Sequence, residues 1–549
     1  MFRTASLLIV IVTTLACSSS QHLQKQIQQS QKIIGLDFQQ KYLDTLTPYL
    51  IRNKVGYDSL RKFQIPHETF PAVLFNPQPF NFEMPTFSNE VRLAHTPEVQ
   101  MPDNMEDLAF YSIAELGALL RSKKISSIEL TSFFLERLKK HNPQLQCAIT
   151  IMEDRALAKA RVADQEIRNG NFRSTLHGIP FGTKDLMSVE GYPTTWGARP
   201  YQNQVIDHTA TVIKKLEDAG AILIAKLTSG ALARGDVWFG GQTKNPWDLT
   251  QGASGSSAGS GSATSAGLVP FALGTETLGS ITSPSNRNGI TGLRPTYGRV
   301  SRDGVMALSW SMDKVGPMCR NARDCALVFD IIRGVDTLDQ TTIDPGFDYN
   351  ENINLNQLRI AYLKEDIDKD TTDVGTNLKN AIEEIRKITS AKLQPIQLPD
   401  SYPIEAFDII LRSESGAMFD ELVRSGEVNT MVEQSKRSRA NSLRQSRFIP
   451  AVEYIQANRV RTLLIQEINE LFNDYDVIIS PTFARPQLLI TNLTGHPVIT
   501  LPTGLDKKGR PTSITFIGNL YQEGIILAFA NAFQRATKFD ELHPPLFSQ

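Results

Sequence analysis

The sequence predicts an α/β protein with a mixed central sheet covered by helices on both faces. Short apolar runs typical of buried strands occur at 221–225, 268–273, 477–480 and 498–501. Helical patterns separate these runs, as at 210–219 and 460–472. Such alternation is typical of a sheet with a helical layer on each side. The composition agrees, because 549 residues, 41% of them hydrophobic and 21% charged, can bury a sizeable globular core.

Charge and cysteine content exclude several kinds of protein. The 57 basic and 58 acidic side chains nearly cancel, giving a net charge of −1. Such a chain has no overall field that attracts nucleic acid or an anionic membrane, so we expect neither as a partner. Four cysteines are too few for a disulfide scaffold in a chain of this length.

Residues 1–16 have the features of a signal peptide. Arg3 is followed by an uncharged stretch whose centre, 7–12, is wholly apolar. This stretch is shorter than the roughly 20 residues of a membrane-spanning helix, which favours cleavage over a permanent anchor. The sequence T-T-L-A-C resembles a bacterial lipobox, in which cleavage leaves Cys17 to carry lipid; plain secretion and a chance match are the alternatives. We therefore expect an exported protein, a periplasmic or cell-envelope lipoprotein or a secreted one, with no other membrane attachment.

Residues 17–106 are predicted to form a tether and a wrapping extension. Half of the residues in 21–32 are glutamine. Apolar residues become denser beyond them, but Pro48 is expected to interrupt any helix there and leave short helical pieces. Seven prolines from Pro66 to Pro102 exclude long helices. They favour an extended segment that lies over the body of the protein.

The body is predicted to span residues 107–549. Its first clear helix signal is a capping box formed by Ser126 and Glu129. The stretch 351–450, which is charged and helix-patterned, is expected to be a lobe on the same sheet. The apolar residues that follow the capping box share one helical face, as in a core helix: Leu130, Phe134 and Leu138.

A stretch of small residues at 252–265 is the strongest candidate for a functional site. Ten of its fourteen residues are Gly or Ser, and composition alone suggests a flexible linker. The stretch instead runs directly into a buried-strand pattern at 266–274. G-T-E-T-L-G-S follows, in which Ser280 comes after a glycine just beyond the strand. A linker does not usually lead into such an arrangement.

Four segments resemble the amidase signature family: G-A-S-G-S-S-A-G-S, A-G-L-V-P-F-A-L-G-T-E-T-L-G-S, G-L-R-P-T-Y-G-R-V-S, and G-I-P-F-G-T-K-D at 178–185. The similarity extends over roughly 107–545. It implies the amidase signature fold and a catalytic triad. In that triad Ser280 is the nucleophile, Ser256 is a bridging serine on a cis peptide bond, and Lys184 is the base.

A lysine base also fits the chemistry of these residues. A serine hydroxyl needs a neighbouring base to take its proton, and none of the eight histidines stands in a triad-like setting. The lysine must be neutral, so we expect Lys184 to be buried, because burial lowers a lysine pKa and a nearby carboxylate raises it. The side chain of Asp185, the next residue, is expected to point elsewhere. Lys226, in A-K-L-T-S-G, is expected to be structural.

The loop that precedes the nucleophile is expected to stabilise an oxyanion. Backbone N–H groups of Thr277, Leu278 and Gly279 can converge on one point. The positive end of a helix that follows can face the same point.

This loop departs from the common family form, T-D-T-G-G-S-I-R, because it has the sequence T-E-T-L-G-S-I-T. Glu276 keeps the acid, but Thr282 replaces the usual arginine, which leaves Arg287 or Arg294 as a partner for the acid. Leu278 resists the positive φ that glycine adopts, so the loop is expected to differ in detail.

Other polar residues have weaker claims to function. Ser257 and Ser260 are expected to be structural, with hydroxyls bonded to Ser280 or to backbone. The histidines show no metal-ligand spacing, and Cys319 and Cys325 are typical of a core. We therefore expect neither a metal nor a cofactor.

The residues and the resemblance together predict an exported amidohydrolase acting on a small molecule. It cleaves a carboxylic amide other than a peptide bond through an acyl-enzyme, in a pocket that the resemblance assigns to 412–419, 431–448 and 495–497. One alternative is the glutaminase A-type subunit of a tRNA-dependent amidotransferase, which shares the whole signature but does not fit an exported chain. Another is a non-catalytic binding protein on the same fold, against which the retained triad residues argue. The sequence specifies neither the amide substrate nor an oligomeric state.

Overall fold

The computed structural model describes residues 22–548 apart from 63–64, 68, 95–97 and 485. The predicted signal peptide, residues 1–16, and the predicted lipid-bearing Cys17 lie outside the described residues.

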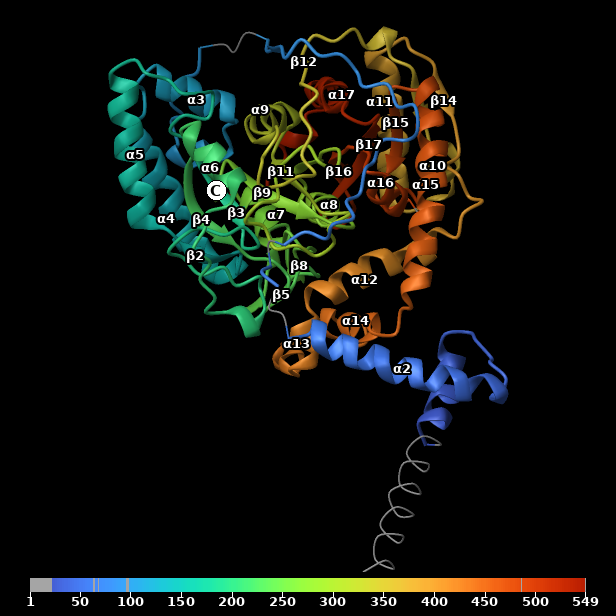
Figure 1. Ribbon diagram of the computed structural model, residues 1–549. Helices are drawn as coiled ribbons and strands as arrows, with labels where there is room; N and C mark the ends of the chain where they lie inside the picture. The colour runs from blue at the N-terminus through green and yellow to red at the C-terminus, as the bar shows by residue number, and fades with distance from the viewer. Residues whose placement is uncertain (1–21, 63–64, 68, 95–97, 485, 549) are drawn as a thin grey trace, which may run out of the picture.

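An eleven-stranded sheet forms the centre of the body, with strand order β14-β13-β15-β17-β16-β10-β11-β9-β3-β4-β2 (Figure 1). Parallel pairs such as β3 with β4 and β9 occur beside antiparallel pairs such as β9 with β11, so the sheet is mixed, as predicted. The strands are β2 Ala148–Ile151, β3 Pro180–Lys184, β4 Ile222–Leu227, β9 Phe271–Glu276, β10 Thr291–Arg294, β11 Lys314–Cys319, β13 Ile360–Tyr362, β14 Leu393–Pro395, β15 Val477–Pro481, β16 Val498–Leu505 and β17 Pro511–Gly518.

Helices cover both faces of this sheet. Thr291 of β10 accepts a hydrogen bond from Gln534 of α17. Gly292 follows Thr291 in the strand, and Ser285 of α8 fills the space over it. Neighbouring residues of a strand face opposite sides, so α8 and α17 lie on opposite faces. The helices of the body are α3 Ile113–Arg121, α4 Ser127–Leu145, α5 Glu153–Arg168, α6 Thr211–Asp218, α7 Ala258–Ser265, α8 Thr282–Asn288, α9 Ala322–Ile332, α10 Lys364–Lys369, α11 Asp373–Ile388, α12 Asp408–Met418, α13 Asp420–Arg424, α14 Arg439–Ser446, α15 Ala451–Asp474, α16 Gln487–Thr494 and α17 Glu523–Thr537.

The local sequence signals produce the expected elements in most places. The Ser126 hydroxyl accepts the Glu129 N–H, and the Glu129 carboxylate accepts the Ser126 N–H, which closes the capping box of α4. The predicted helix and strand at 210–225 are α6 and β4. The apolar run at 268–273 is different, because its strand begins only at Phe271. Pro270 has no N–H to donate to a ladder, so the preceding residues form a buried bend instead.

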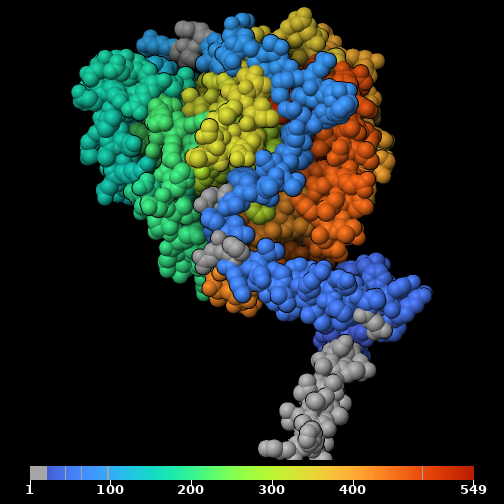
Figure 2. All heavy atoms as spheres, in the orientation of Figure 1, coloured from blue at the N-terminus to red at the C-terminus, as the bar shows by residue number. Residues whose placement is uncertain are grey.

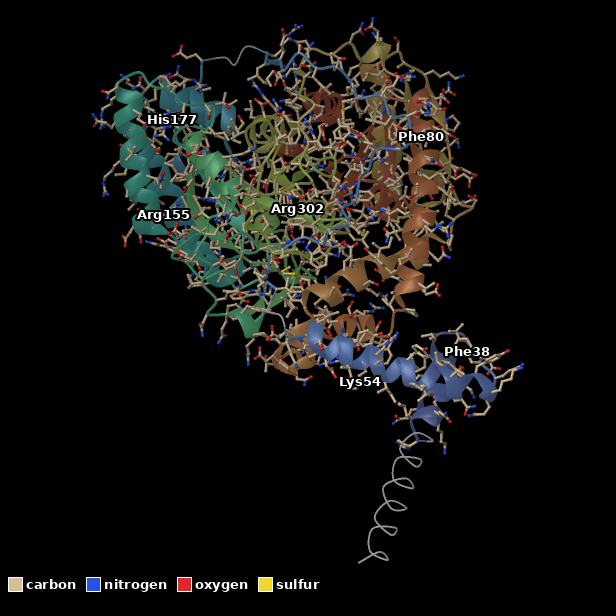
Figure 3. All side chains as sticks on the ribbon, viewed as in Figure 1. Phe38, Lys54, Phe80, Arg155, His177 and Arg302 are labelled. Atoms are coloured by element: carbon tan, nitrogen blue, oxygen red, sulfur yellow. The ribbon has the colours of Figure 1, made fainter. Side chains whose placement is uncertain are left out.

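The prediction that Pro48 interrupts the helix was wrong. Helix α2, Gln40–Leu60, runs through Pro48 over 21 residues. An interior proline removes one N–H and its ring crowds the carbonyl four residues earlier, at a cost of about 3 kcal/mol, yet the helix continues past it. The hydroxyl of Thr47 adds a bond of 2.6 Å to the Leu43 carbonyl. This helix lies outside the body, and Figure 3 shows Lys54 on it and Phe38 just before it. No helix in the described part of the chain combines the length and the apolar character needed to cross a membrane.

The segment after α2 runs over the surface of the body as an extended chain (Figure 2). We call the described residues of 65–94 the strap. Ser88 donates its N–H and its hydroxyl to the Asp348 carboxylate, at 3.1 and 2.9 Å. Strand β1, Val91–Arg92, pairs in parallel with β12, Tyr349–Asn350. The ring of Phe75 lies 3.6 Å from the Arg461 guanidinium, so the strap is attached to the body at several points.

Candidate active site

Lys184 is the last residue of β3 and its side chain is fully buried. Its Nζ donates to Ser256 Oγ at 2.7 Å and to Thr275 Oγ1 at 2.8 Å. The Thr275 carbonyl lies 3.5 Å away. Thr275 belongs to β9, which pairs with β3 in parallel, so the sheet itself holds this hydroxyl against the amine. Both close partners are neutral.

The surroundings of Lys184 favour the neutral amine. Burial lowers its pKa well below the ordinary value, and the carboxylates of Asp313 and Glu276 oppose this only in part. No carboxylate in the described part of the chain forms an ion pair with Lys184. A lowered pKa favours the neutral amine, which is the form that a general base needs.

Ser256 is fully buried in the loop that leads into α7. The peptide bond between Gly255 and Ser256 is cis, as the family resemblance implies. Gly255 lies so close to another part of the backbone that a Cβ there would be 1.8 Å from the Gly235 carbonyl oxygen. Only glycine fits this position.

Ser280 follows β9 and precedes α8, with 8% of its surface exposed. Its carbonyl accepts the Ser257 N–H at 3.2 Å, which places the turn around Ser280 beside Ser256. Ser280 and Gly255 line the same cavity. The structure therefore brings together the three residues that the sequence analysis selected, Lys184, Ser256 and Ser280.

In the loop before Ser280, Leu278 does not have to adopt a positive φ. The positive φ, +84°, falls on Gly279, while Leu278 is not among the residues with positive φ. Within the described part of the chain, no acceptor bonds the N–H groups of Leu278, Gly279 and Ser280. These groups are available to an oxyanion. The N–H of Thr277 stays a predicted donor, and the hydroxyl of the same residue donates to Asp313 at 2.5 Å.

The expectation that the start of α8 faces the oxyanion was wrong. The N–H groups of Ile281 and Thr282 donate to Glu276 Oε2, at 2.8 and 2.9 Å. This carboxylate therefore occupies the donors of the helix start. Its other oxygen accepts from Arg294 at 2.7 Å and from Asn492 at 2.9 Å. Burial would raise the pKa of Glu276, but the Arg294 charge and these hydrogen bonds outweigh it and lower the pKa to about 2.

Of the two arginines considered as partners for the acid, Arg294 is therefore the one used. Arg287 instead donates to the side chain of Gln251 at 3.0 Å. The Glu276 carboxylate therefore binds the loop through the N–H groups of Ile281 and Thr282, and the Arg294 guanidinium neutralises its charge inside the protein.

Lys226 and Asp185 form a separate buried pair with 2.8 Å between Nζ and Oδ1. The Lys226 amine also donates to Thr194 Oγ1 and to the Pro193 carbonyl, both at 2.6 Å. Asp185 Oδ2 accepts the Thr195 N–H at 2.9 Å. The Asp185 side chain points away from Lys184, as expected, and Lys226 has only structural contacts.

The remaining candidates are also structural. Ser257 Oγ donates to the Thr275 carbonyl at 3.1 Å, and Ser260 Oγ donates to the Leu273 carbonyl at 2.8 Å. Cys319 and Cys325 are buried free thiols.

Two cavities meet beside these candidate residues. The first, of about 440 Å³, is closed on one side by the strap, and its lining includes Thr275, Thr277, Trp196, Met306, His67 and Phe70. The ring of Phe70 lies 5.1 Å from the guanidinium of Arg302. Figure 3 shows Arg302 within the body. The second, of about 340 Å³, reaches Ser280 itself. Both cavities share Ala233, Thr277 and Leu308.

The pocket expected from the resemblance is only partly correct. Residues of 412–419 and 431–448 line the second cavity, through Arg412 and the side chains from Lys436 to Gln445. The segment 495–497 lines neither cavity, because Gly495 packs against Pro77 of the strap and against Tyr297.

Two residues of the site were not selected from the sequence. Thr275 lies in the segment G-T-E-T-L-G-S, two residues before Thr277. This spacing could have indicated that both side chains lie on the same face of the strand. Asp313 accepts from Thr277 and from the N–H groups of Leu308 and Ser309, at 2.7 and 2.9 Å. No sequence pattern marks Asp313, because its partners come together only in the fold.

The comparisons with known proteins agree with this geometry. Residues 129–490 match the family described as Amidase. The A-type subunit of the glutamyl-tRNA(Gln) amidotransferase from Nitrosomonas europaea is 32% identical over 79% of this chain and 98% of its own length. Native peptide amidase from Stenotrophomonas maltophilia has a TM-score of 0.70 at 27% identity, covering 79% of this chain and 98% of that chain. An amidase family protein from Bacillus anthracis has a TM-score of 0.71 at 25% identity, covering 80% and 93%. The fold, the motifs and these relatives together show that the chain belongs to the amidase family.

Proposed function

We propose that this protein hydrolyses a carboxylic amide through an acyl-enzyme on Ser280. The observation that carries the proposal is the contact of 2.7 Å between the Lys184 amine and the Ser256 hydroxyl, at a buried lysine that lacks a carboxylate partner. A neutral amine beside a serine hydroxyl is a base ready to take a proton.

The proposed proton path runs through the three residues in turn. Lys184 takes the proton of Ser256, and Ser256 takes the proton of Ser280, whose oxygen attacks the amide carbon. The N–H groups of Leu278, Gly279 and Ser280 stabilise the negative oxygen of the tetrahedral intermediate. The proton then returns through Ser256 to the leaving nitrogen, which departs as an amine or ammonia. Water, activated by the same base, releases the acid from Ser280.

A serine-directed fluorophosphonate followed by mass spectrometry tests the nucleophile. We expect the adduct on Ser280 and none in Ser280→Ala. An adduct on Ser256 or Ser257 would contradict the assignment. A panel of aryl, peptide C-terminal and fatty acyl amides then defines the substrate, and the absence of both labelling and turnover would favour a non-catalytic binding protein.

The curated relatives favour a second candidate, the glutamine-hydrolysing subunit of a tRNA-dependent amidotransferase. The match to such a subunit covers 98% of that protein's length at 32% identity. The chemistry at Ser280 is the same in both candidates, but here glutamine is the substrate, and the ammonia passes to a protein partner. The second candidate predicts glutamate release that rises on addition of partner subunits. The first predicts amide hydrolysis by the isolated chain.

We also propose export with lipid on Cys17, supported by the charged start, the apolar centre and the A-C junction of the first 17 residues. Cys17→Ser should move the protein from the membrane fraction to the soluble fraction. Unchanged membrane retention would rule out simple lipidation. This proposal separates the two candidates as well, because an amidotransferase subunit works where aminoacyl-tRNA is made.

A further inference from the structure

The N-terminal helical unit, residues 22–62, differs from the rest of the chain in charge. It contains seven basic and three acidic residues, whereas the whole chain has a net charge of −1. Asp58 pairs with Lys54 and Arg61. The unit therefore has a local excess of positive charge, which the net charge of the chain conceals. Its other five bases form no ion pair within the described part of the chain: Lys25, Lys32, Lys41, Arg52 and Lys62.

The second half of α2 has no cover among the described residues. In the first half Leu43 is buried, and Gln40 accepts from Gln28 of the helical residues 22–33 at 2.8 Å. Every residue from 51 to 60 is exposed. Most helices in proteins are stable because one face packs against another surface. The exposed half of α2 therefore indicates a contact with something outside the described chain.

Aromatic and apolar side chains form a line along α2. Tyr42, Tyr49 and Leu60 are separated by seven and eleven residues, close to two and three turns of a helix with about 3.6 residues per turn. More than half of each residue is exposed. Lys41 and Arg52 lie beside this line, 4.9 and 4.8 Å from the centres of the Tyr42 and Tyr49 rings. Tyrosines flanked by basic side chains are typical of the boundary between a membrane and water.

The body continues this apolar surface. Tyr57 and Leu60 line a cavity of about 690 Å³ together with residues of 446–454, and α2 lies next to α14 at one end of the molecule (Figure 1, Figure 2). Three large apolar residues at this point are more than half exposed: Phe448, Val452 and Ile455. We call these three residues, the line along α2 and its two bases the docking surface.

The predicted site of lipid attachment is close to this surface along the chain. Cys17 is five residues before His22, where the described residues begin. An extended chain covers at most about 3.6 Å per residue, so Cys17 is within about 18 Å of the helical residues 22–33. Lipid on Cys17 would therefore hold residues 22–62 against the membrane. A surface rich in unpaired bases is complementary to anionic lipid.

We propose that the docking surface binds an anionic lipid bilayer, with Tyr42, Tyr49 and Leu60 in the interfacial layer and the unpaired bases against lipid phosphates. The inference goes beyond the proposed function, because it does not depend on Ser280. Docking supplements lipid on Cys17 and does not replace it, since salt weakens a contact made through charge. The chain without lipid therefore still leaves the membrane fraction when that fraction is washed with salt.

Co-sedimentation with vesicles tests the surface in the absence of attached lipid. The chain from residue 17 onward, carrying Cys17→Ser, is mixed with vesicles of phosphatidylcholine alone or of phosphatidylcholine and phosphatidylglycerol in equal amounts. Each basic residue near an anionic surface raises binding roughly fivefold. We expect at least a tenfold preference for the anionic vesicles, which high salt removes because it screens the charges.

Charge variants assign this preference to α2. Lys41→Gln combined with Arg52→Gln should weaken binding to the anionic vesicles at least tenfold. Lys140→Gln combined with Arg161→Gln is the matched control, because it removes two exposed bases from α4 and α5, which lie away from α2 (Figure 1). The control should bind like the parent chain. Thermal unfolding and labelling of Ser280 by the fluorophosphonate should be the same in all these proteins.

Apolar variants test the rest of the docking surface. Tyr42→Ser combined with Tyr49→Ser keeps every charge and should still weaken binding several-fold, because it removes side chains from the interfacial layer. Val452→Ser combined with Ile455→Ser should do the same if the body also touches the bilayer. An effect of the tyrosine pair alone would restrict the docking surface to α2.

Each result supports the inference or contradicts it. Equal binding to both kinds of vesicle, binding to neither, or an equal loss in the control pair would overturn it. Sedimentation velocity without vesicles tests a second copy of this chain as the other occupant. A dimer that the tyrosine pair dissociates, together with no vesicle binding, would assign the surface to that copy and overturn the inference. In each of these cases the proposed chemistry at Ser280 is unaffected.

Discussion

Two buried lysines on neighbouring strands of this protein have opposite surroundings. Lys184 ends β3 and Lys226 lies in β4, and both side chains are fully buried. Lys226 meets the Asp185 carboxylate at 2.8 Å. Lys184 meets the hydroxyls of Ser256 and Thr275. Burial is the same for both, so the partner distinguishes the paired lysine, Lys226, from the lysine that we propose as the base, Lys184.

The pKa of each lysine reflects this difference. Burial lowers both, but at Lys226 the adjacent Asp185 opposes the shift by charge and by a hydrogen bond. At Lys184 only more distant carboxylates oppose it, and the pKa is lowered well below its ordinary value. Asp185 follows Lys184 in the chain, yet its side chain forms an ion pair with Lys226. This is possible because successive residues of an extended chain point to opposite sides.

The largest expected effect is the loss of the base. Lys184→Ala should lower kcat/KM by roughly 10²–10⁴-fold, the usual contribution of general base catalysis. Lys184→Arg should fail as well, because arginine does not lose its proton. The measurements are kcat/KM for a reactive amide and the rate of labelling by a fluorophosphonate. Lys226→Ala is the matched control and should retain the rate per folded molecule. The reverse pattern would mean that the base is assigned to the wrong lysine.

Loss of the other lysine should appear in stability instead. Lys226→Ala leaves Asp185 buried without its cation, and removing one partner of a buried pair costs about 3–5 kcal/mol. Urea unfolding should show this loss, and adding Asp185→Asn should restore part of it because no isolated charge then remains. A Lys226→Ala protein as stable as wild type would show that the pair is not needed for the fold.

The third expected effect is a dependence of stability on pH. The folded pKa of Lys184 lies below its unfolded value of about 10.4, so the unfolded chain binds a proton that the folded chain does not. The free energy of unfolding should therefore fall as the pH drops from about 10.4 towards the folded pKa, by up to about 1.4 kcal/mol per pH unit. Lys184→Met should lack this contribution. An unchanged slope in Lys184→Met would mean that the amine is charged in the folded protein.

The residues of the site differ in how far the sequence could predict them. Short sequence motifs contain Lys184, Ser256 and Ser280, so these residues could be selected without knowledge of the fold. That the N–H groups at the start of α8 are occupied could not be predicted in the same way. The Glu276 carboxylate reaches them only after the chain turns back. The role of Asp313 could not be predicted either, because its hydrogen-bond donors come from separate segments of the chain.

The fold shows a similar division between local and long-range information. The mixed sheet follows from apolar runs that each form a strand. Helix α2 was missed because Pro48 was expected to end it, whereas a helix of 21 residues tolerates one interior proline. The strap residues His67 and Phe70 reach the first cavity through contacts far apart in sequence, which no local pattern contains.

The smallest expected effect sharpens the comparison at the level of one hydroxyl. Thr275→Val keeps the shape of the side chain but removes the oxygen that accepts from Lys184 at 2.8 Å. An ordinary hydrogen bond contributes about 0.5–1.5 kcal/mol, so kcat should fall roughly 2–12-fold. The lost acceptor stabilises an ammonium more than an amine, so the pKa of Lys184 should fall further and the rising limb of the kcat/KM profile should move to lower pH.

Thr194→Val is the equivalent change at Lys226, whose amine donates to Thr194 at 2.6 Å. It should leave that limb in place, because Lys226 is not the proposed base. A shift of the limb in Thr194→Val but not in Thr275→Val would show that the two lysines are coupled and that the carboxylate partner alone does not separate their roles.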